Sequence, residues 1–76
     1  MVHAYIMVKT APGASSGTID AIRSVDEITE AHVVAGEHDI IAEVNVDDVY
    51  SVLQTASSTL QSLDGITETR TYIALD

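Results

Sequence analysis

Alternating apolar and polar residues near the start of the chain predict a β-strand over residues 3–9, HAYIMVK. Pro12 and Gly13 end this strand, because proline donates no ladder hydrogen bond and restricts the residue before it. One side of the strand is apolar and the other is mixed. The apolar side comprises Ala4, Ile6 and Val8, and the mixed side comprises His3, Tyr5, Met7 and Lys9.

A first helix is predicted from the spacing of Ile19, Ile22 and Val25, with Ser15 or Ser16 as its N-cap. It is short and carries a glycine, so packing has to hold it.

A second, longer helix is predicted after Asp47 or Asp48, either of which can cap it. Gly65 stands where a left-handed C-cap is expected. Between Asp48 and Gly65 the apolar residues recur in steps of four and three, which places them in one stripe along the predicted helix. The stripe comprises Val49, Leu53, Ala56, Leu60 and Leu63.

A β-hairpin is predicted from residues 29–35 and 40–46 around Gly36–Asp39. If the numbers of paired residues sum to 75, one face is wholly apolar and the other is mixed. The apolar pairs are Ala35–Ile40, Val33–Ala42 and Ala31–Val44; the others are Val34–Ile41, His32–Glu43 and Glu30–Asn45.

Residues 66–75, ITETRTYIAL, complete the pattern as a last strand. The order β-α-β-β-α-β predicts an α+β, ferredoxin-like fold, in which two helices cover one face of a four-stranded antiparallel sheet. The other face is only partly polar, and its four apolar residues lie on adjacent strands, where they form a patch. These residues, Tyr5, Met7, Val34 and Ile41, are the expected interface with a second copy of the chain.

The length of 76 residues fits one domain, residues 1–76, with a hydrophobic content of 46%. Phe, Trp and Cys are absent, so the core has to be aliphatic and without disulfides. A chain of this size buries only about 60% of its unfolded surface, which favours self-association as a further source of stability.

A net charge of −9, from twelve acidic and three basic residues, argues against direct binding to nucleic acid or to an anionic membrane. An acidic surface with almost no lysine also fits a halophile's cytoplasm, and an acidic mesophilic protein is the alternative. No signal sequence or membrane-length apolar run is apparent, so a cytoplasmic location is expected.

The histidines do not show the spacing of a recognised metal site, and neither a metal nor another cofactor is expected. His32 opposite Glu43 fits a cross-strand ion pair instead. Residues 13–17 match G-x-S-x-G, but that motif works only on a strand-to-helix turn of a much larger parallel sheet. No catalytic residue is assigned.

The hairpin tip is the candidate binding site. Its glycine allows a permissive backbone, exposed N–H groups can receive a carboxylate, and Asp39 can complement an ammonium group, which together suit an amino-acid zwitterion. The alternative is ordinary hairpin chemistry, in which Asp39 bonds to the loop backbone.

Four segments resemble the effector-binding (RAM) domain of the Lrp/AsnC family of transcription regulators. They are the opening AYIMVKTAPG, the segment ITEAHVVAGEHDIIAEV with its G-x-x-D turn, the second helix running into SLDGI, and the closing TETRTYIAL. The resemblance implies the fold described above, sheets of two protomers packed face to face in a dimeric α/β-barrel-type assembly, and dimers assembled into rings. It also implies amino-acid effectors bound between dimers, which assigns ligand-binding roles to Gly36, Glu37, His38, Asp39, Thr69 and Thr71.

Members of that family usually carry an N-terminal helix-turn-helix, and this sequence resembles the effector domain by itself. The expected function is therefore non-enzymatic amino-acid sensing and oligomerisation, acting on transcription indirectly through a DNA-binding relative or another protein. One alternative is a purely structural regulatory subunit that binds a protein. Another is a small cofactor-independent enzyme of the dimeric α/β-barrel type, with His3 or His32 as base.

Overall fold

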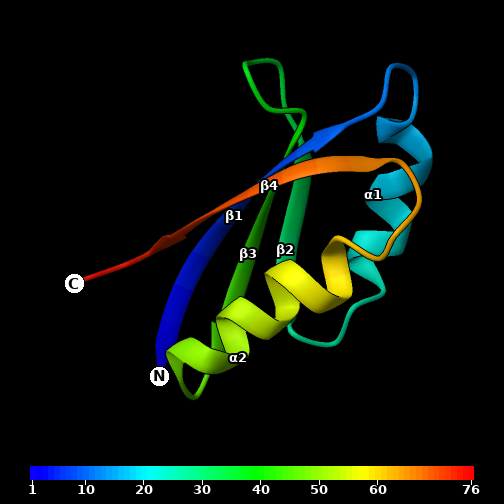
Figure 1. Cartoon of the computed structure of the whole chain (residues 1–76). Helices are drawn as coiled ribbons and strands as arrows, with labels where there is room; N and C mark the ends of the chain where they lie inside the picture. The colour runs from blue at the N-terminus through cyan, green and yellow to red at the C-terminus, as the bar shows by residue number, and fades with distance from the viewer.

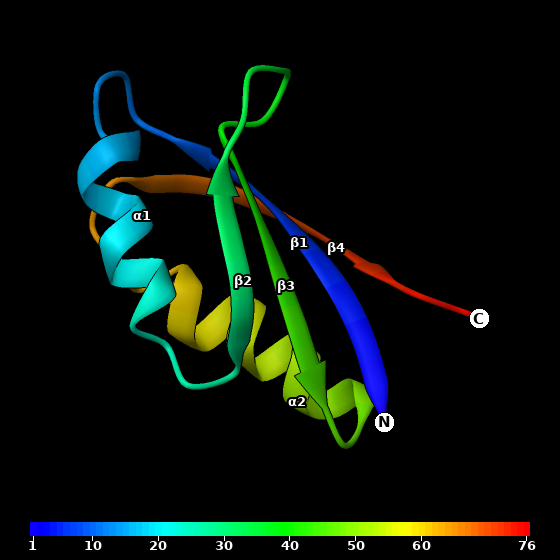
Figure 2. The same cartoon turned by 180° about the vertical axis from the view of Figure 1, so that it is seen from behind.

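A four-stranded antiparallel sheet with its helices on one side makes up the computed structural model, which describes all 76 residues. The strands lie in the order β2-β3-β1-β4, and both helices cover the same face (Figures 1 and 2). The predicted ferredoxin-like architecture is confirmed. In chain order the elements are β1 (Val2–Thr10), α1 (Ser15–Arg23), β2 (Ile28–Val33), β3 (Ile40–Val46), α2 (Val49–Gln54), the π-helical turn η1 (Thr55–Leu60) and β4 (Ile66–Ile73).

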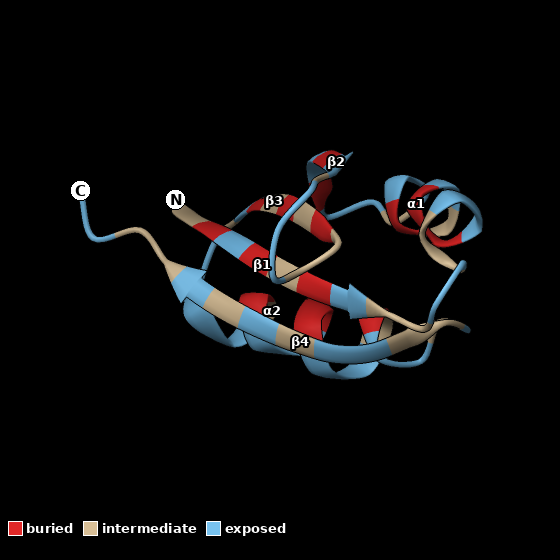
Figure 3. Ribbon diagram, turned by 90° about the horizontal axis from the view of Figure 1, so that it is seen from above, coloured by how far each residue is buried: buried red, intermediate tan, exposed pale blue.

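The core lies between the sheet and the helices and is aliphatic, as expected. Buried and exposed positions alternate along β1 (Figure 3), because successive side chains of a strand point to opposite faces. Side chains with no exposed surface come from two strands and the helices: Ala4, Ile6, Val8, Ile40, Ala42, Val44, Ile22, Val52 and Leu60.

Only one of the three predicted helix caps is confirmed. Asp48 caps α2, with its carboxylate accepting from the backbone N–H of Ser51 at 2.7 Å. Gly65 has the expected left-handed φ of 92°, but it lies in the connection to β4, because the second helical segment already ends at Leu60 with Gln61 as its C-cap. The cap predicted for the first helix is wrong: α1 begins at Ser15 after Ala14, and no side chain caps it.

The second helical segment departs from the predicted stripe, because it changes from α to π geometry at Thr55. The hydroxyls of Thr55 and Ser57 bond the carbonyls four residues back, at 2.9 and 2.7 Å, and so compete with the backbone N–H groups for those acceptors. The buried side chains recur in steps of four, at Val52, Ala56 and Leu60. Two members of the predicted stripe, Val49 and Leu53, are about half exposed instead, at 47% and 52%.

The register of the β2–β3 hairpin also differs from the prediction, by two residues. Val33 lies opposite Ile40 and Ala31 opposite Ala42, so the numbers of paired residues sum to 73. A shift of two keeps every side chain on its expected face. The cause is β1: the N–H of Asp39 donates to the carbonyl of Val8 at 2.9 Å, which aligns β3 from outside the hairpin.

The new register removes the expected ion pair between His32 and Glu43. His32 lies opposite Ile41, and its Nε2 is 2.9 Å from Oε1 of Glu30 on the same strand. Glu43 contacts His3 of β1 instead, at 3.1 Å. The predicted ion pair between His32 and Glu43 is therefore wrong, because the shifted register places Glu30, and not His32, opposite Glu43.

Candidate functional site

The hairpin tip, residues 35–39, projects beyond the end of the sheet as the green loop in Figure 1. A backbone bond from the N–H of Val34 to the carbonyl of Asp39, 2.8 Å long, closes it. Gly36 is not in the left-handed region, and a Cβ there would meet nothing closer than the His38 carbonyl, at 4.0 Å. The expectation that the tip needs a permissive glycine is wrong; Gly36 and Glu37 are simply exposed.

Asp39 fixes the base of the tip to the end of β1. Its Oδ2 accepts from the backbone N–H of Thr10 at 2.8 Å and from the Thr10 hydroxyl at 3.2 Å. These bonds stabilise the ionised carboxylate, and the backbone bond is the main reason why the pKa of Asp39 lies below its usual value. Asp39 therefore has a structural role, as in the alternative interpretation of the hairpin. Its carboxylate bonds the end of β1, however, and not the backbone of the loop.

His38 joins the tip to β4. Its side chain is only 15% exposed, and its Nε2 lies 3.4 Å from Oε2 of Glu68 without making a hydrogen bond. Arg70 reaches the same carboxylate oxygen through Nε, at 3.3 Å. The Arg70 guanidinium, followed by the His38 ring, holds the pKa of Glu68 below its usual value.

Thr69 and Thr71 lie on the other face of β4. They are opposite Val8 and Ile6, whose side chains are buried under the helices, and Oγ1 of Thr69 accepts from Gln61 at 2.9 Å. The structure therefore does not bring these threonines together with His38 on one surface. A ligand at the tip reaches them only around the free edge of β4 or from another protomer.

The sheet face away from the helices carries the predicted apolar patch. Met7 lies directly opposite Ile41, and Tyr5, 37% exposed, follows two residues away on the same side of β1. Tyr72 of β4, which the sequence interpretation missed, pairs with Tyr5 and is 56% exposed. Val34 is half-buried just beyond the end of β2. We name Tyr5, Met7, Ile41 and Tyr72 the open-face patch.

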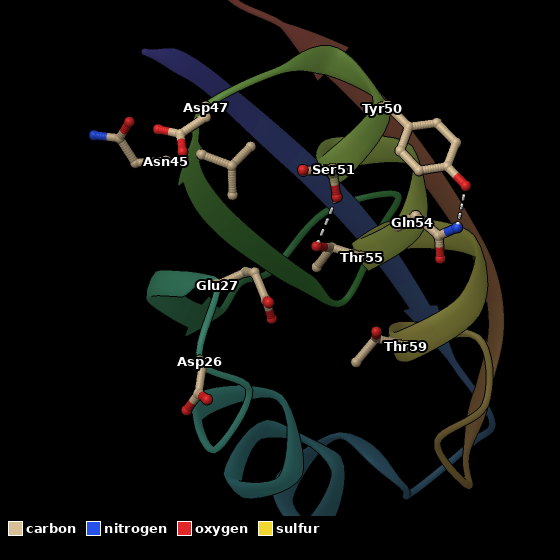
Figure 4. Close-up of a pocket in the computed structure, with 10 residues that line it drawn as sticks. Asp26, Glu27, Asn45, Asp47, Tyr50, Ser51, Gln54, Thr55 and Thr59 are labelled. Carbon is tan, nitrogen blue, oxygen red and sulfur yellow. Dashed lines mark hydrogen bonds between the residues drawn. The ribbon is translucent and has the colours of Figure 1, made fainter.

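A cleft of about 590 Å³ lies near the end of the sheet away from the tip, between the α1–β2 connection and the second helical segment. Figure 4 shows the carboxylates on one side of it, together with the amide of Asn45, and the hydroxyl groups and the amide of Gln54 on the other. The lining has no histidine and no basic side chain, and it comprises Asp26, Glu27, Asn45, Val46, Asp47, Tyr50, Ser51, Gln54, Thr55 and Thr59. His3 and His32, the candidate bases of the enzyme alternative, lie on the opposite face of the sheet.

Acid should weaken the attachment of the tip. The pKa of Asp39 is lowered on folding, so its contribution to stability is present above the unfolded pKa, near 3.8, and is lost as the pH falls through the lower folded value. We expect the melting temperature to fall below about pH 4, and Asp39→Asn to reduce this fall. Thermal unfolding followed by circular dichroism, from pH 7 to pH 2.5, measures the melting temperature of both proteins.

Glu37→Gln serves as the control for this titration, because Glu37 is an exposed neighbour without a hydrogen bond in the structure. An equal acid dependence in Asp39→Asn and in the wild type would contradict the assigned role.

Comparison with known proteins supports a regulatory domain. Residues 3–76 match the family model of the Lrp/AsnC ligand binding domain. The leucine-responsive regulatory protein of Haemophilus influenzae is 34% identical over 56 residues, which cover 74% of this chain and 34% of that protein. The chain thus spans about a third of the length of the curated relatives that it matches.

Solved structures agree with this match. The crystal structure of FFRP-DM1 is 32% identical, has a TM-score of 0.90, and is aligned over 99% of this chain and 100% of its own. A transcriptional regulator of Neisseria meningitidis, solved as a complex with L-Met, shares the fold at 18% identity, with a TM-score of 0.86 over 99% of this chain and 50% of its own. No helix of this structure is long and apolar enough to cross a bilayer. By its sequence and its fold, the chain belongs to the Lrp/AsnC ligand-binding domain family.

Proposed function

We propose that this protein is a non-enzymatic amino-acid sensor whose effector binds at the hairpin tip and alters the assembly of its protomers. The observation that carries the proposal is membership of a ligand-binding domain family, one fold relative of which was solved with L-Met. The tip adds a suitable chemistry, since Asp39 supplies an ionised carboxylate and Gly36 and Glu37 supply exposed backbone.

A second protomer covers the open-face patch in this proposal. Side chains of three adjacent strands leave apolar surface on that face, and a small chain benefits from burying it. Dimers then assemble further into a ring, with Thr69 and Thr71 of one protomer near the tip of another. Effector binding favours whichever arrangement it fits better, and so changes the affinity for a DNA-binding relative or another protein partner.

Isothermal titration calorimetry against the twenty amino acids tests this function. We expect at least one apolar amino acid to bind, and Asp39→Asn to weaken it by roughly 10-fold to 100-fold, because a hydrogen bond to a charged group contributes about 1.5 to 3 kcal/mol. Asparagine keeps an oxygen that can accept from Thr10, so this variant removes the charge and leaves a weaker attachment of the tip in place.

Asp20→Asn removes the same charge from an exposed position on α1 and is expected to bind like the wild type. If none of the twenty amino acids binds the wild-type protein, the sensor proposal fails, and a structural subunit that binds only protein becomes the better interpretation.

A further inference from the structure

The three histidines of the chain share one surface and one kind of partner. Each belongs to the open face, the side of the sheet away from the helices, or to the hairpin tip beside it. Each also has its Nε2 close to a glutamate oxygen. The pairs are His3–Glu43 at 3.1 Å, His32–Glu30 at 2.9 Å and His38–Glu68 at 3.4 Å. Imidazole is the side chain that ordinarily titrates near neutral pH, and all of it lies on the face that the proposed dimer buries.

The match is also complete in the other direction. The strands contain three acidic residues, one each on β2, β3 and β4, and these are the three glutamates of the pairs. None of the other acidic residues forms an ion pair with a histidine. Every strand carboxylate of the open face therefore has a group beside it that can neutralise it on protonation.

Protonation of the histidines changes the charge of the open face by a large fraction. Its other charged groups gather at the tip. Arg70 bonds Glu68 at 3.3 Å, Lys9 lies opposite Glu68, and Asp39 accepts from Thr10. With neutral histidines the face carries four carboxylates and two basic side chains, a net charge of −2 on a chain of −9. Three imidazolium groups raise these values to +1 and −6.

His38 is the histidine whose surroundings change most on protonation. Its side chain is 15% exposed, and its buried Nε2 has no hydrogen bond although Oε2 of Glu68 is 3.4 Å away. A buried polar atom without a partner is unfavourable, whereas an imidazolium and a carboxylate form a strong, charge-assisted bond. Lys9, Asp39 and Arg70 are the other charged groups around this pair.

The other two histidines have simpler surroundings. His3 has Glu43 on one side and the uncharged Ala74 on the other, and its ring meets that of Tyr5 with the centroids 5.0 Å apart. His32 lies on the edge strand β2, with an uncharged residue opposite it on β3. The face also carries tyrosines, but phenols ionise only near pH 10. The glutamate is thus the closest charged neighbour of each of these histidines.

Burial of the open face makes the charge of the histidines important for association. A carboxylate that is taken out of water without a cation beside it loses its hydration and gains too little in return. When the adjacent histidine is protonated, the pair enters the interface with no net charge. Two chains of −9 also repel each other more strongly than two chains of −6. Both effects favour association of the protonated form.

Resting on the face-to-face assembly proposed above, we propose that the open face is a pH-sensitive interface, whose three histidines take up protons when two protomers associate. The direction follows from linkage, because lower pH favours the state that binds more protons, and here that state is the dimer. The dimer therefore tightens as the pH falls from 7.5 to 5.5. Carboxylates titrate near pH 4, so the glutamates keep their charge over this range.

Sedimentation equilibrium of the full chain at pH 7.5 and pH 5.5, in the same salt, tests the proposal. We expect the association constant of the wild type to rise at least about tenfold, since each proton taken up per dimer changes it tenfold per pH unit. His3→Gln/His32→Gln/His38→Gln keeps side chains that can bond the glutamates but do not titrate. The association constant of this triple variant should change less than about twofold.

Ser58→His, added to the triple variant, is the matched control. It returns an imidazole to an exposed position on η1, on the helical side of the sheet, and should leave the variant insensitive to pH. A response restored by this distant histidine would assign the effect to net charge alone and overturn the proposal. The α-amino group of Met1 is present in every variant, so it does not account for a difference between them.

Circular dichroism at both pH values shows whether each variant is folded. If the triple variant is unfolded, His3→Gln/His32→Gln replaces it, because these side chains are 36% and 59% exposed and His38 stays in place. This double variant should lose more than half of the wild-type response. A folded variant that responds to pH as the wild type does overturns the proposal.

The outcomes separate this inference from the function on which it rests. A wild type that dimerises equally well at both pH values overturns the pH-sensitive interface and leaves the dimer and the sensor intact. A wild type that stays a single protomer at both pH values overturns the inference together with the open-face interface. Amino-acid binding is measured independently, by calorimetry at pH 7.5, so failure of the sensor is recognised without reference to sedimentation.

Discussion

Ile41→Glu is expected to sediment as a single protomer at concentrations at which the wild type sediments as a dimer or a larger particle. Ile41 lies at the centre of the open-face patch, directly opposite Met7, and a two-fold interface places the new carboxylate in both protomers. Loss of a central contact costs about 2 to 4 kcal/mol at each of the two equivalent positions. Association should therefore weaken roughly a thousandfold or more.

Leu53→Glu is the control for sedimentation. Leu53 is as hydrophobic as Ile41 and is 52% exposed, but it lies on α2, away from the open-face patch. We expect this variant to stay assembled in both dilute and concentrated salt. A wild type that sediments as one protomer, or a Leu53→Glu that dissociates while Ile41→Glu does not, would show that the open face is not the interface.

Gly65→Ala should destabilise the protein by about 2 to 5 kcal/mol. Gly65 has a φ of 92°, where a side chain costs roughly 1 to 2 kcal/mol. A Cβ at this position would also lie 2.8 Å from Oγ1 of Thr18 and 3.2 Å from Cβ of Ala14. Thr18 is buried on α1, so relief of this contact has to move the helix, which adds about 1 to 3 kcal/mol. Urea unfolding at a fixed protein concentration measures the change.

Gly17→Ala supplies the matched control, because the same substitution is made two residues after Ser15, within α1. A Cβ at Gly17 meets nothing within 4 Å, and its backbone is helical. We expect a gain of about 0.5 to 1 kcal/mol from the lower entropy of the unfolded chain. Equal effects of the two substitutions, in either direction, would refute the role assigned to Gly65.

The strongly acidic composition makes the association of this protein sensitive to salt. Screening by salt shortens the range of repulsion among the carboxylates of a chain with a net charge of −9. Assembly through the open-face patch should therefore strengthen in concentrated salt. Sedimentation of the wild type at two salt concentrations measures this effect.

The candidate site could be predicted only in part. The G-x-x-D turn predicts a ligand-binding role for four consecutive residues, Gly36, Glu37, His38 and Asp39. The role of Glu68 and Arg70 had no comparable signal, since they are about thirty residues further along, within an alternating strand. Lys9 lies opposite Glu68 because the first and last strands form an antiparallel pair, and the alternating pattern of either strand alone does not specify that register.

The sequence by itself determined the periodicities, and with them the order of the elements, the face that each strand buries, the N-cap at Asp48 and the left-handed turn at Gly65. These features depend on neighbouring residues, so they can be recognised locally. Tertiary structure decided the hairpin register, through the bonds of Asp39 to β1, and it brought Lys9, His38, Glu68 and Arg70 together on one face. Such contacts join residues far apart in the chain, and several pairings satisfy the same two-residue period until a third strand selects one.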